Sequence, residues 1–281
     1  MIIILHENKE WIQPFEDALK SINADFKFWY IPELDIDFNK APQDAIYYNR
    51  MSASSHTRGH RYDPEITIGI LEWLKRHNKI IINGPRALDL EISKLRQYQE
   101  LEKFNIKTPK TYASIKTESL LANANKLGFP LISKHNRAGK GLGVYKFNNY
   151  QELNDFYNSP SFESSVDGIN LIQSYIDAPE PFITRMEFIG GKFFYAVKVD
   201  TSEGFELCPA DNCEINTNCP TSEIQKFEII NNFVMPNIKN YEDFTNQIDY
   251  FIENYTENIE KIKIEAGNLT ISEKLVDELI K

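Results

Sequence analysis

The segment Lys134-His-Asn-Arg-Ala-Gly-Lys-Gly-Leu-Gly143 carries the strongest signal in the chain. It combines three alternating glycines with two cations: Gly139, Gly141, Gly143, Arg137 and Lys140. Glycine lets backbone N–H groups turn toward a ligand and approach it closely, so the loop suits a polyphosphate. It is not a P-loop, because no Ser or Thr follows Lys140, and no third glycine opens a helix as in a dinucleotide fingerprint. Taken alone, the same loop could equally be a mobile surface turn.

Strands are predicted on both sides of this loop. The residue patterns indicate strands at 130–134, 143–147, 171–176, 182–189 and 192–199. The last two meet at Gly190-Gly191, a two-residue turn typical of a β-hairpin. Further elements are expected as helices at 119–127, 150–157 and 241–255, a strand at 262–265 and a helix from Ser272.

The first 85 residues alternate between strands and helices. We expect strands at 2–5, 26–31, 45–48 and 79–82, helices at 11–22 and from Pro64, and then one helix over 87–104. This order predicts an α/β unit with a parallel sheet, which the turn Asn83-Gly84-Pro85 closes.

Composition limits the classes to which the chain can belong. Hydrophobic residues make up 42% of 281 residues, which is enough for a core and excludes a disordered chain. The net charge of −10 argues against nucleic-acid binding. No apolar stretch approaches the roughly 20 residues of a membrane span, and the start lacks a signal-peptide pattern. Three cysteines suit a reducing compartment. We therefore expect a soluble cytoplasmic protein with no nucleic-acid or membrane partner.

Five motifs follow one another along the middle of the chain. They are the turn at 105–111 after a helix with Lys94, the strand Phe129–Lys134, the glycine-rich loop, Gln173-Ser-Tyr-Ile176 and the hairpin Arg185–Lys192. In this order, over roughly residues 45–215, they resemble the ATP-grasp superfamily and, within it, the RimK-type glutamate ligases. Each motif alone is loose, but five in the right order are specific.

The resemblance implies a fold and a division into domains. The fold class is α/β (α+β), an ATP-grasp fold with an N-terminal α/β pre-ATP-grasp domain. The implied domains are 1–85, 86–165 with the glycine-rich flap, and 166–281, whose C-terminal part is atypical or shortened.

The resemblance also implies an ATP-dependent ligase, in which a carboxylate becomes an acyl phosphate and an amine then displaces the phosphate. ATP would be held by Lys94, Lys134, Arg137, Gly139, Lys140, Gly141, Gly143, Gln173, Ser174, Tyr175, Ile176 and Glu180. Arg185 and Lys198 would offset charge on the transferred phosphoryl group. The substrate, an amino acid or a peptide, supplies the nucleophile, so no Ser–His or Cys–His dyad is required. A homo-oligomer is compatible with this pattern.

A second basic cluster follows a strand of the first domain, where α/β sheets present loops to ligands. Its candidates for a carboxylate substrate are Arg50, His56, Arg58 and Arg61, and Asp211 is a candidate for the substrate amine. The alternative is a solvated loop whose charges only aid solubility. Zinc is not favoured, because His56 and His60 lie in a predicted loop and Cys208, Cys213 and Cys219 lack paired spacing.

The magnesium ligands fit the resemblance least well. ATP-grasp enzymes hold Mg²⁺ with an acid on one late strand and a Glu-x-Asn pair on the next, since Mg²⁺ requires hard oxygen ligands. The nearest match, Glu265-Ala-Gly-Asn268, has one residue too many. Three alternatives stay open: Mg²⁺ on Glu265 and Asn268, Mg²⁺ on other acids such as Asp200, Asp211 or Glu187, and nucleotide binding without turnover. A non-catalytic nucleotide-binding module and a kinase are therefore the alternatives to a ligase.

Overall fold

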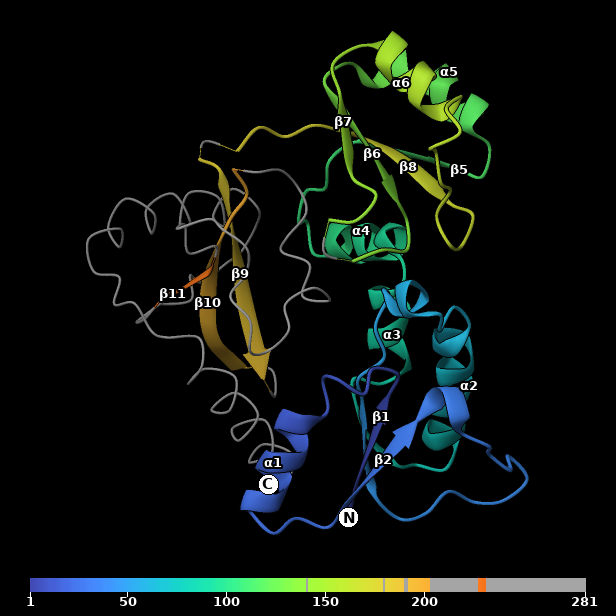
Figure 1. The fold of residues 1–281 in the computed structure, drawn as a ribbon, viewed down its shortest axis with the longest axis vertical. Coiled ribbons are helices and arrows are strands. Elements are labelled where there is room, and N and C mark those ends of the chain that lie inside the picture. Colours follow the sequence, from blue (N-terminus) through green and yellow to red (C-terminus); the bar gives the residue numbers. More distant parts are fainter. Residues whose placement is uncertain (140, 179, 190–191, 203–226, 231–281) are drawn as a thin grey trace. The chain divides into compact units, whose positions relative to one another are not determined.

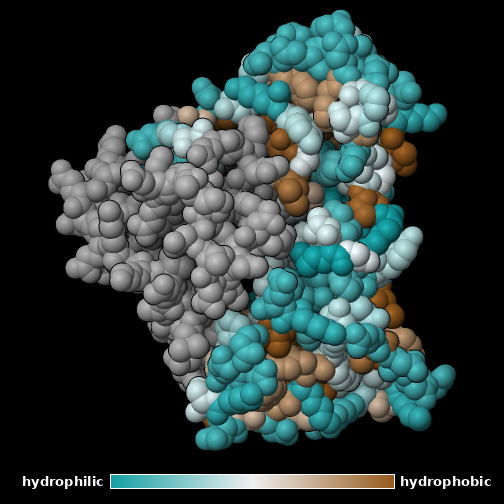
Figure 2. All heavy atoms as spheres, in the orientation of Figure 1, coloured by the Kyte–Doolittle hydropathy of each residue, from teal (hydrophilic) through white to brown (hydrophobic). Residues whose placement is uncertain are grey.

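The computed structural model describes residues 1–139, 141–178, 180–189, 192–202 and 227–230 (Figure 1). This part of the chain forms two compact units, one over Met1–Gln97 and one that begins at Tyr98. The division falls within helix α4 (Lys94–Lys103), and the predicted domain limits stay predictions. On the face shown in Figure 2, the surface of these residues is mainly hydrophilic, with hydrophobic side chains in small groups. None of their helices is long and apolar enough to cross a membrane.

The first unit is built on a parallel sheet with the strand order β2-β1-β3-β4. The strands are β1 (Ile2–His6), β2 (Phe26–Tyr30), β3 (Ile46–Asn49) and β4 (Ile80–Ile82). The helices are α1 (Gln13–Ser21), α2 (Asp63–Arg76) and α3 (Pro85–Glu91), with short 3₁₀ turns η1 (Ile31–Glu33) and η2 (Ser55–Arg58). The parallel sheet confirms the α/β unit predicted for this part of the chain.

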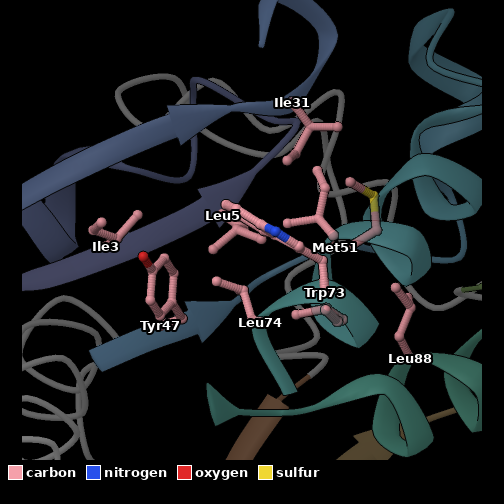
Figure 3. Packing of buried hydrophobic residues seen from close by; sticks show 10 residues of the cluster. Ile3, Leu5, Ile31, Tyr47, Met51, Trp73, Leu74 and Leu88 are labelled. Carbon is pink, nitrogen blue, oxygen red and sulfur yellow. The ribbon is translucent and has the colours of Figure 1, made fainter. Parts of the chain in front are cut away.

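Side chains of the central strands alternate between the two faces of this sheet. Ile3, Leu5 and Tyr47 pack with residues of α2, among them Leu74, in the cluster of Figure 3. The intervening residues of the strands pack instead with α1, in a cluster that contains Ile2, Ile4, Tyr48, Phe15 and Leu19. Helices therefore cover both faces, which explains why β1 is an unbroken apolar run rather than an alternating one.

The single helix predicted over 87–104 is wrong, because the chain forms two helices there. α3 ends at Glu91 and α4 begins at Lys94. The hydroxyl of Ser93 accepts a hydrogen bond from the N–H of Arg96 at 3.4 Å, the role that serine takes at the start of a new helix.

The second unit contains an antiparallel sheet with the order β5-β8-β6-β7. Its strands are β5 (Thr111–Ser114), β6 (Leu131–His135), β7 (Tyr145–Phe147) and β8 (Asn170–Ser174), and its helices are α5 (Thr117–Leu127) and α6 (Tyr150–Tyr157). Both helices share one core cluster with Leu131 and Ile172, so they cover one face of the sheet. Ser133 points the same way, since its Oγ lies 2.9 Å from Tyr157 Oη. Because side chains alternate along a strand, Lys134 faces the opposite side.

A further antiparallel sheet has the order β11-β10-β9, with β9 (Phe182–Ile189), β10 (Lys192–Asp200) and β11 (Phe227–Ile230). The two hairpin strands predicted from the sequence are confirmed. The register pairs Arg185 with Val197 and Thr184 with Lys198. Since residues directly opposite each other share a face, Arg185 and Lys198 project from opposite faces of this sheet.

Candidate functional site

A polar group lies on the face of the second unit's first sheet that α5 and α6 leave uncovered. Lys134 Nζ on β6 donates a hydrogen bond to Gln173 Oε1 on β8 at 2.5 Å. Gln173 Nε2 in turn donates to Thr111 Oγ1 on β5 at 2.9 Å. Three strands therefore each supply one side chain to a hydrogen-bonded network, in which Lys134 and Thr111 together orient Gln173.

The environment of Lys134 disfavours its charge. Desolvation lowers the pKa of Lys134 to about 8, and no carboxylate among the described residues forms an ion pair with it. Its Nζ lies 5.2 Å from the ring centroid of Tyr98. Desolvation raises the pKa of Tyr98, so the charged form is disfavoured at both residues. A half-buried cation without an anionic neighbour is costly unless a ligand supplies the negative charge, so this lysine is suited to an anion.

The glycine-rich loop connects β6 to β7 through tight turns. Gly141 and Gly143 have φ angles of 81° and 68°, in the left-handed region that favours glycine. A Cβ at Gly143 would lie 2.8 Å from ring atoms of His135, so only glycine fits that position without displacing the ring. Lys140 lies outside the described residues.

The start of the loop is fixed by hydrogen bonds. Asn136 Nδ2 donates to Asp167 Oδ2 at 2.6 Å, and the N–H of Arg137 donates to Ser165 Oγ at 3.2 Å. Arg137 is buried, with 3% of its surface exposed. The sequence places it as a cation on a loop, whereas the structure packs it against the anchored base of that loop.

The segment after β8 has its own backbone pattern. The N–H of Ser174 donates to the carbonyl of Lys110 at 2.9 Å, and that of Tyr175 donates to the carbonyl of Pro130 at 3.3 Å. Ile176, the next residue, is 58% exposed.

The two predicted phosphoryl-binding cations lie on the other sheet of the second unit. Arg185 is exposed on β9, as is Ile183 two residues earlier. Lys198 is half-buried on the opposite face, with Nζ 4.2 Å from the ring centroid of Phe182. Glu180, which the sequence assigns to ATP, is exposed just before β9. One face of this sheet can thus offer Arg185 or Lys198 to a ligand, but not both.

The basic cluster of the first unit is largely engaged in internal contacts. Arg58 forms a bidentate ion pair with Glu7, through Nε at 3.1 Å and Nη2 at 2.5 Å, and the Glu7 side chain is 1% exposed. His56 Nδ1 lies 3.1 Å from the carbonyl oxygen of Ala53. The remaining members also have neighbours: His60 lies beside Asp63 and Arg61 over the ring of Tyr62. The charge of Arg58 is therefore neutralised within the protein.

Arg50 differs from these residues because it lines a cavity of about 380 Å³ at the ends of β3 and β4. Trp11, Asn83 and Glu91 line the same cavity. These three residues are not among the site residues predicted from the sequence, and neither are Tyr98 and Thr111 beside Lys134. No local motif in the sequence links these residues, so no sequence signal could have found them.

Metal ligands are not found in the described part of the chain, where no three His, Cys, Asp or Glu side chains gather. The predicted ligands Glu265 and Asn268 lie outside it. So do Asp211 and the three cysteines.

The chain is similar in sequence and in fold to several known proteins. No family model matches the chain. It is 23% identical over 164 residues to beta-citrylglutamate synthase B of Danio rerio, and 31% identical over 99 residues to a D-alanine–D-alanine ligase of Pseudomonas entomophila. These matches cover 57% and 35% of the chain, but only 39% and 30% of the two relatives.

Solved structures match over more of their length. The ATP-grasp ligase PsnB with a minimal precursor superposes with a TM-score of 0.58 at 10% identity, covering 99% of this chain and 98% of that one. D-alanyl-alanine synthetase A of Vibrio cholerae gives 0.56 at 13% identity, over 90% and 80%. A RimK-domain ATP-grasp protein of Sphaerobacter thermophilus gives 0.50 at 15% identity, over 72% and 87%.

These likenesses define the class: the chain has the α/β ATP-grasp fold. The ATP-grasp fold that the five motifs implied is therefore confirmed. Within that class, the solved structures that it matches include RimK-domain and D-alanyl-alanine synthetase types.

Proposed function

We propose that the protein is an ATP-dependent ligase that joins a carboxylate to an amine and releases ADP and phosphate. The observation that carries this proposal is Lys134, a desolvated cation without an ionic partner among the described residues, placed at the foot of a glycine-rich loop in an ATP-grasp fold. The proteins with related sequences or folds are named as synthases and ligases, which supports the same reaction class.

The nucleotide would lie on the sheet face that carries Lys134. Lys134 would bind a phosphate oxygen, and the turns at Gly141 and Gly143 would let the loop approach the phosphates closely. Since the N–H groups of Ser174 and Tyr175 already donate within the protein, we assign the adenine contact to the N–H of Ile176. Lys94, at the start of α4, stays a predicted phosphate contact.

In the reaction, an oxygen of the substrate carboxylate attacks the terminal phosphorus, and ADP leaves with the bond's electron pair. The amine then attacks the acyl carbon, loses a proton and expels phosphate. Arg185 is the better candidate to offset charge during transfer, because it is exposed whereas Lys198 packs over Phe182 on the opposite face. Mg²⁺ remains a prediction, and no step depends on it.

The substrate class is proposed as an amino acid or a peptide. D-alanine–D-alanine ligase takes an amino acid by name, and PsnB was solved with a precursor, so both kinds occur among proteins that this chain resembles. Because the sequence matches the metal-ligand pattern only incompletely, the alternative to a ligase is a module that binds the nucleotide without turning it over.

The test compares Lys134→Met with the control Lys126→Met, which removes an exposed lysine of α5 whose contact is Asn123. Lys134→Met removes a desolvated charge and keeps the length of the side chain, so it should fold. We expect ATP binding, measured by calorimetry, to be lost in Lys134→Met and kept in the control.

Turnover separates the ligase from its rivals. ADP should appear only when both an acid and an amine are present, and Arg185→Ala should lower turnover more than ATP affinity. ADP release with one substrate and no amine would indicate a kinase. ATP binding without ADP under any mixture would indicate the module, and equal ATP affinity in Lys134→Met and wild type would refute the nucleotide site itself.

A further inference from the structure

The cavity at the ends of β3 and β4 is a built pocket. At about 380 Å³ it is large enough for a small molecule. The side-chain amide of Asn49 donates to the carbonyl of Asn83 at 2.9 Å, and that of Asn83 donates to the carbonyl of Asn49 at 3.3 Å. Asn49 Oδ1 also accepts the N–H of Met51 at 3.0 Å. These reciprocal bonds fix the loops that follow the two strands, so the cavity does not need to be organised by its ligand.

Arg50 provides a fixed positive charge in this cavity. Its guanidinium carbon lies 4.5 Å from the ring centroid of Phe15, and its Nη1 donates to Tyr48 Oη at 3.3 Å. These contacts orient the side chain without neutralising it, and no carboxylate of the described residues pairs with it. This distinguishes Arg50 from Arg58, whose charge Glu7 neutralises.

Glu91 provides the opposite charge in the same cavity. It is the last residue of α3, and its Oε1 accepts a long hydrogen bond of 3.5 Å from the N–H of Ala53. Desolvation by the surrounding protein raises the pKa of Glu91, and the N–H of Ala53 and the charge of Lys94 partly offset this rise. A cation placed in the cavity would therefore stabilise the ionised form of Glu91.

We propose that this cavity binds a small zwitterion, with its carboxylate on Arg50 and its ammonium group on Glu91, a free amino acid being the simplest such ligand. Trp11 and Leu88 supply apolar wall for its carbon skeleton. An acid that lacks the amine is repelled by the negative charge of Glu91. An amine that lacks the carboxylate is repelled by the positive charge of Arg50, so each single-charge analogue binds less well than the zwitterion. That the ligand is a reactant rests on the proposed ligase function, but the binding itself does not.

The first experiment uses the wild-type protein without nucleotide. The proteinogenic L-amino acids, D-alanine and inorganic phosphate are each added at about 10 mM, and stabilisation of the folded state is read as a rise in melting temperature. The best amino acid is then compared by calorimetry with the acid that lacks its amino group and the amine that lacks its carboxylate. We expect both analogues to bind at least about tenfold more weakly, the loss of one charge-assisted contact.

Two variants assign the charges to their residues. Arg50→Gln should weaken binding of the amino acid about tenfold or more but should not weaken binding of the amine analogue, which no longer meets the positive charge of Arg50. Glu91→Gln keeps an acceptor for the N–H of Ala53, and it should weaken binding of the amino acid but not of the acid analogue, which no longer meets the negative charge of Glu91. Arg76→Gln and Glu72→Gln, which change exposed charges of α2, are the matched controls.

The proposal is overturned if no amino acid binds, if phosphate binds more tightly than every amino acid, or if the single-charge analogues match the parent in wild type. The comparison of the analogues with the parent amino acid uses only the wild-type protein, so it tests the proposal even if a variant fails to fold. ATP affinity of Arg50→Gln should equal that of wild type. If the wild-type protein does not bind ATP, the proposed ligase function is refuted and this inference is not. If it binds ATP but no amino acid, this inference is refuted and the proposed nucleotide site is not.

Discussion

The pKa of Lys134 makes the affinity for ATP depend on pH in a defined direction. A lysine with a pKa of about 8 is mostly protonated at pH 7 and mostly neutral at pH 9. If only the protonated form binds a phosphate, the competent fraction falls from about 0.9 to about 0.1, so ATP affinity falls about tenfold between these values. An ordinary lysine, with a pKa near 10.4, would leave affinity almost flat over this range.

The described side chains beside Lys134, namely Tyr98, Gln173 and Thr111, do not titrate in this window. The pKa of Tyr98 is raised above its ordinary value near 10, and Gln173 and Thr111 carry no charge. Phosphate groups lose their last proton near pH 6, so the ligand is already ionised. The slope between pH 7 and pH 9 therefore reports on Lys134.

The assay is calorimetric titration of ATP at pH 7, 8 and 9 at constant ionic strength. Lys134→Arg, which carries a guanidinium that stays protonated throughout this range, should bind ATP with little dependence on pH, whereas the control Lys126→Arg should keep the wild-type slope. A flat profile in wild type would refute the reasoning, and so would the same slope in Lys134→Arg.

Two predictions concern stability, measured by urea denaturation. Gly143→Ala should cost more than Gly168→Ala, because both have positive φ but only the first meets a side chain, His135. The left-handed backbone alone costs about 1–2 kcal/mol, so equal losses would show that the contact with His135 is absent. Arg58→Met should cost about 3–5 kcal/mol, since it leaves the buried Glu7 carboxylate unpaired. The double variant Arg58→Met/Glu7→Gln should recover part of the lost free energy of unfolding. A loss below about 1 kcal/mol in Arg58→Met alone would contradict a buried ion pair.

Local patterns were sufficient to predict most of the fold. β1 and the hairpin strands β9 and β10 follow from runs of apolar residues and a Gly-Gly turn, because burial and turn chemistry act over a few neighbouring residues. The break between α3 and α4 was not predicted, since Ser93 is compatible with a helix interior and only its hydrogen bond to Arg96 shows that it starts a new one.

Partners far apart in the sequence could not be predicted in the same way. Lys134 stands out by its place before the glycine loop, but its contact with Gln173 is 39 residues away and depends on the pairing of β6 with β8. Arg58 looks like a ligand-binding cation in the sequence, and its partner Glu7 is 51 residues away. Charge in a loop thus says little about function until the neighbouring carboxylates are known.

The hairpin shows how one residue changes the composition of a site. At the tip, Lys192 pairs with Ile189, and if that register continued, Lys198 would pair with Ile183 and share a face with Arg185. The register instead shifts by one residue between Phe193 and Tyr195, so Lys198 pairs with Thr184. A one-residue shift moves every later side chain to the other face. An unshifted register would therefore place both cations on one face of the sheet, whereas the irregularity in β10 places Lys198 on the face opposite Arg185. This is why we propose Arg185, and not Lys198, for the phosphoryl group.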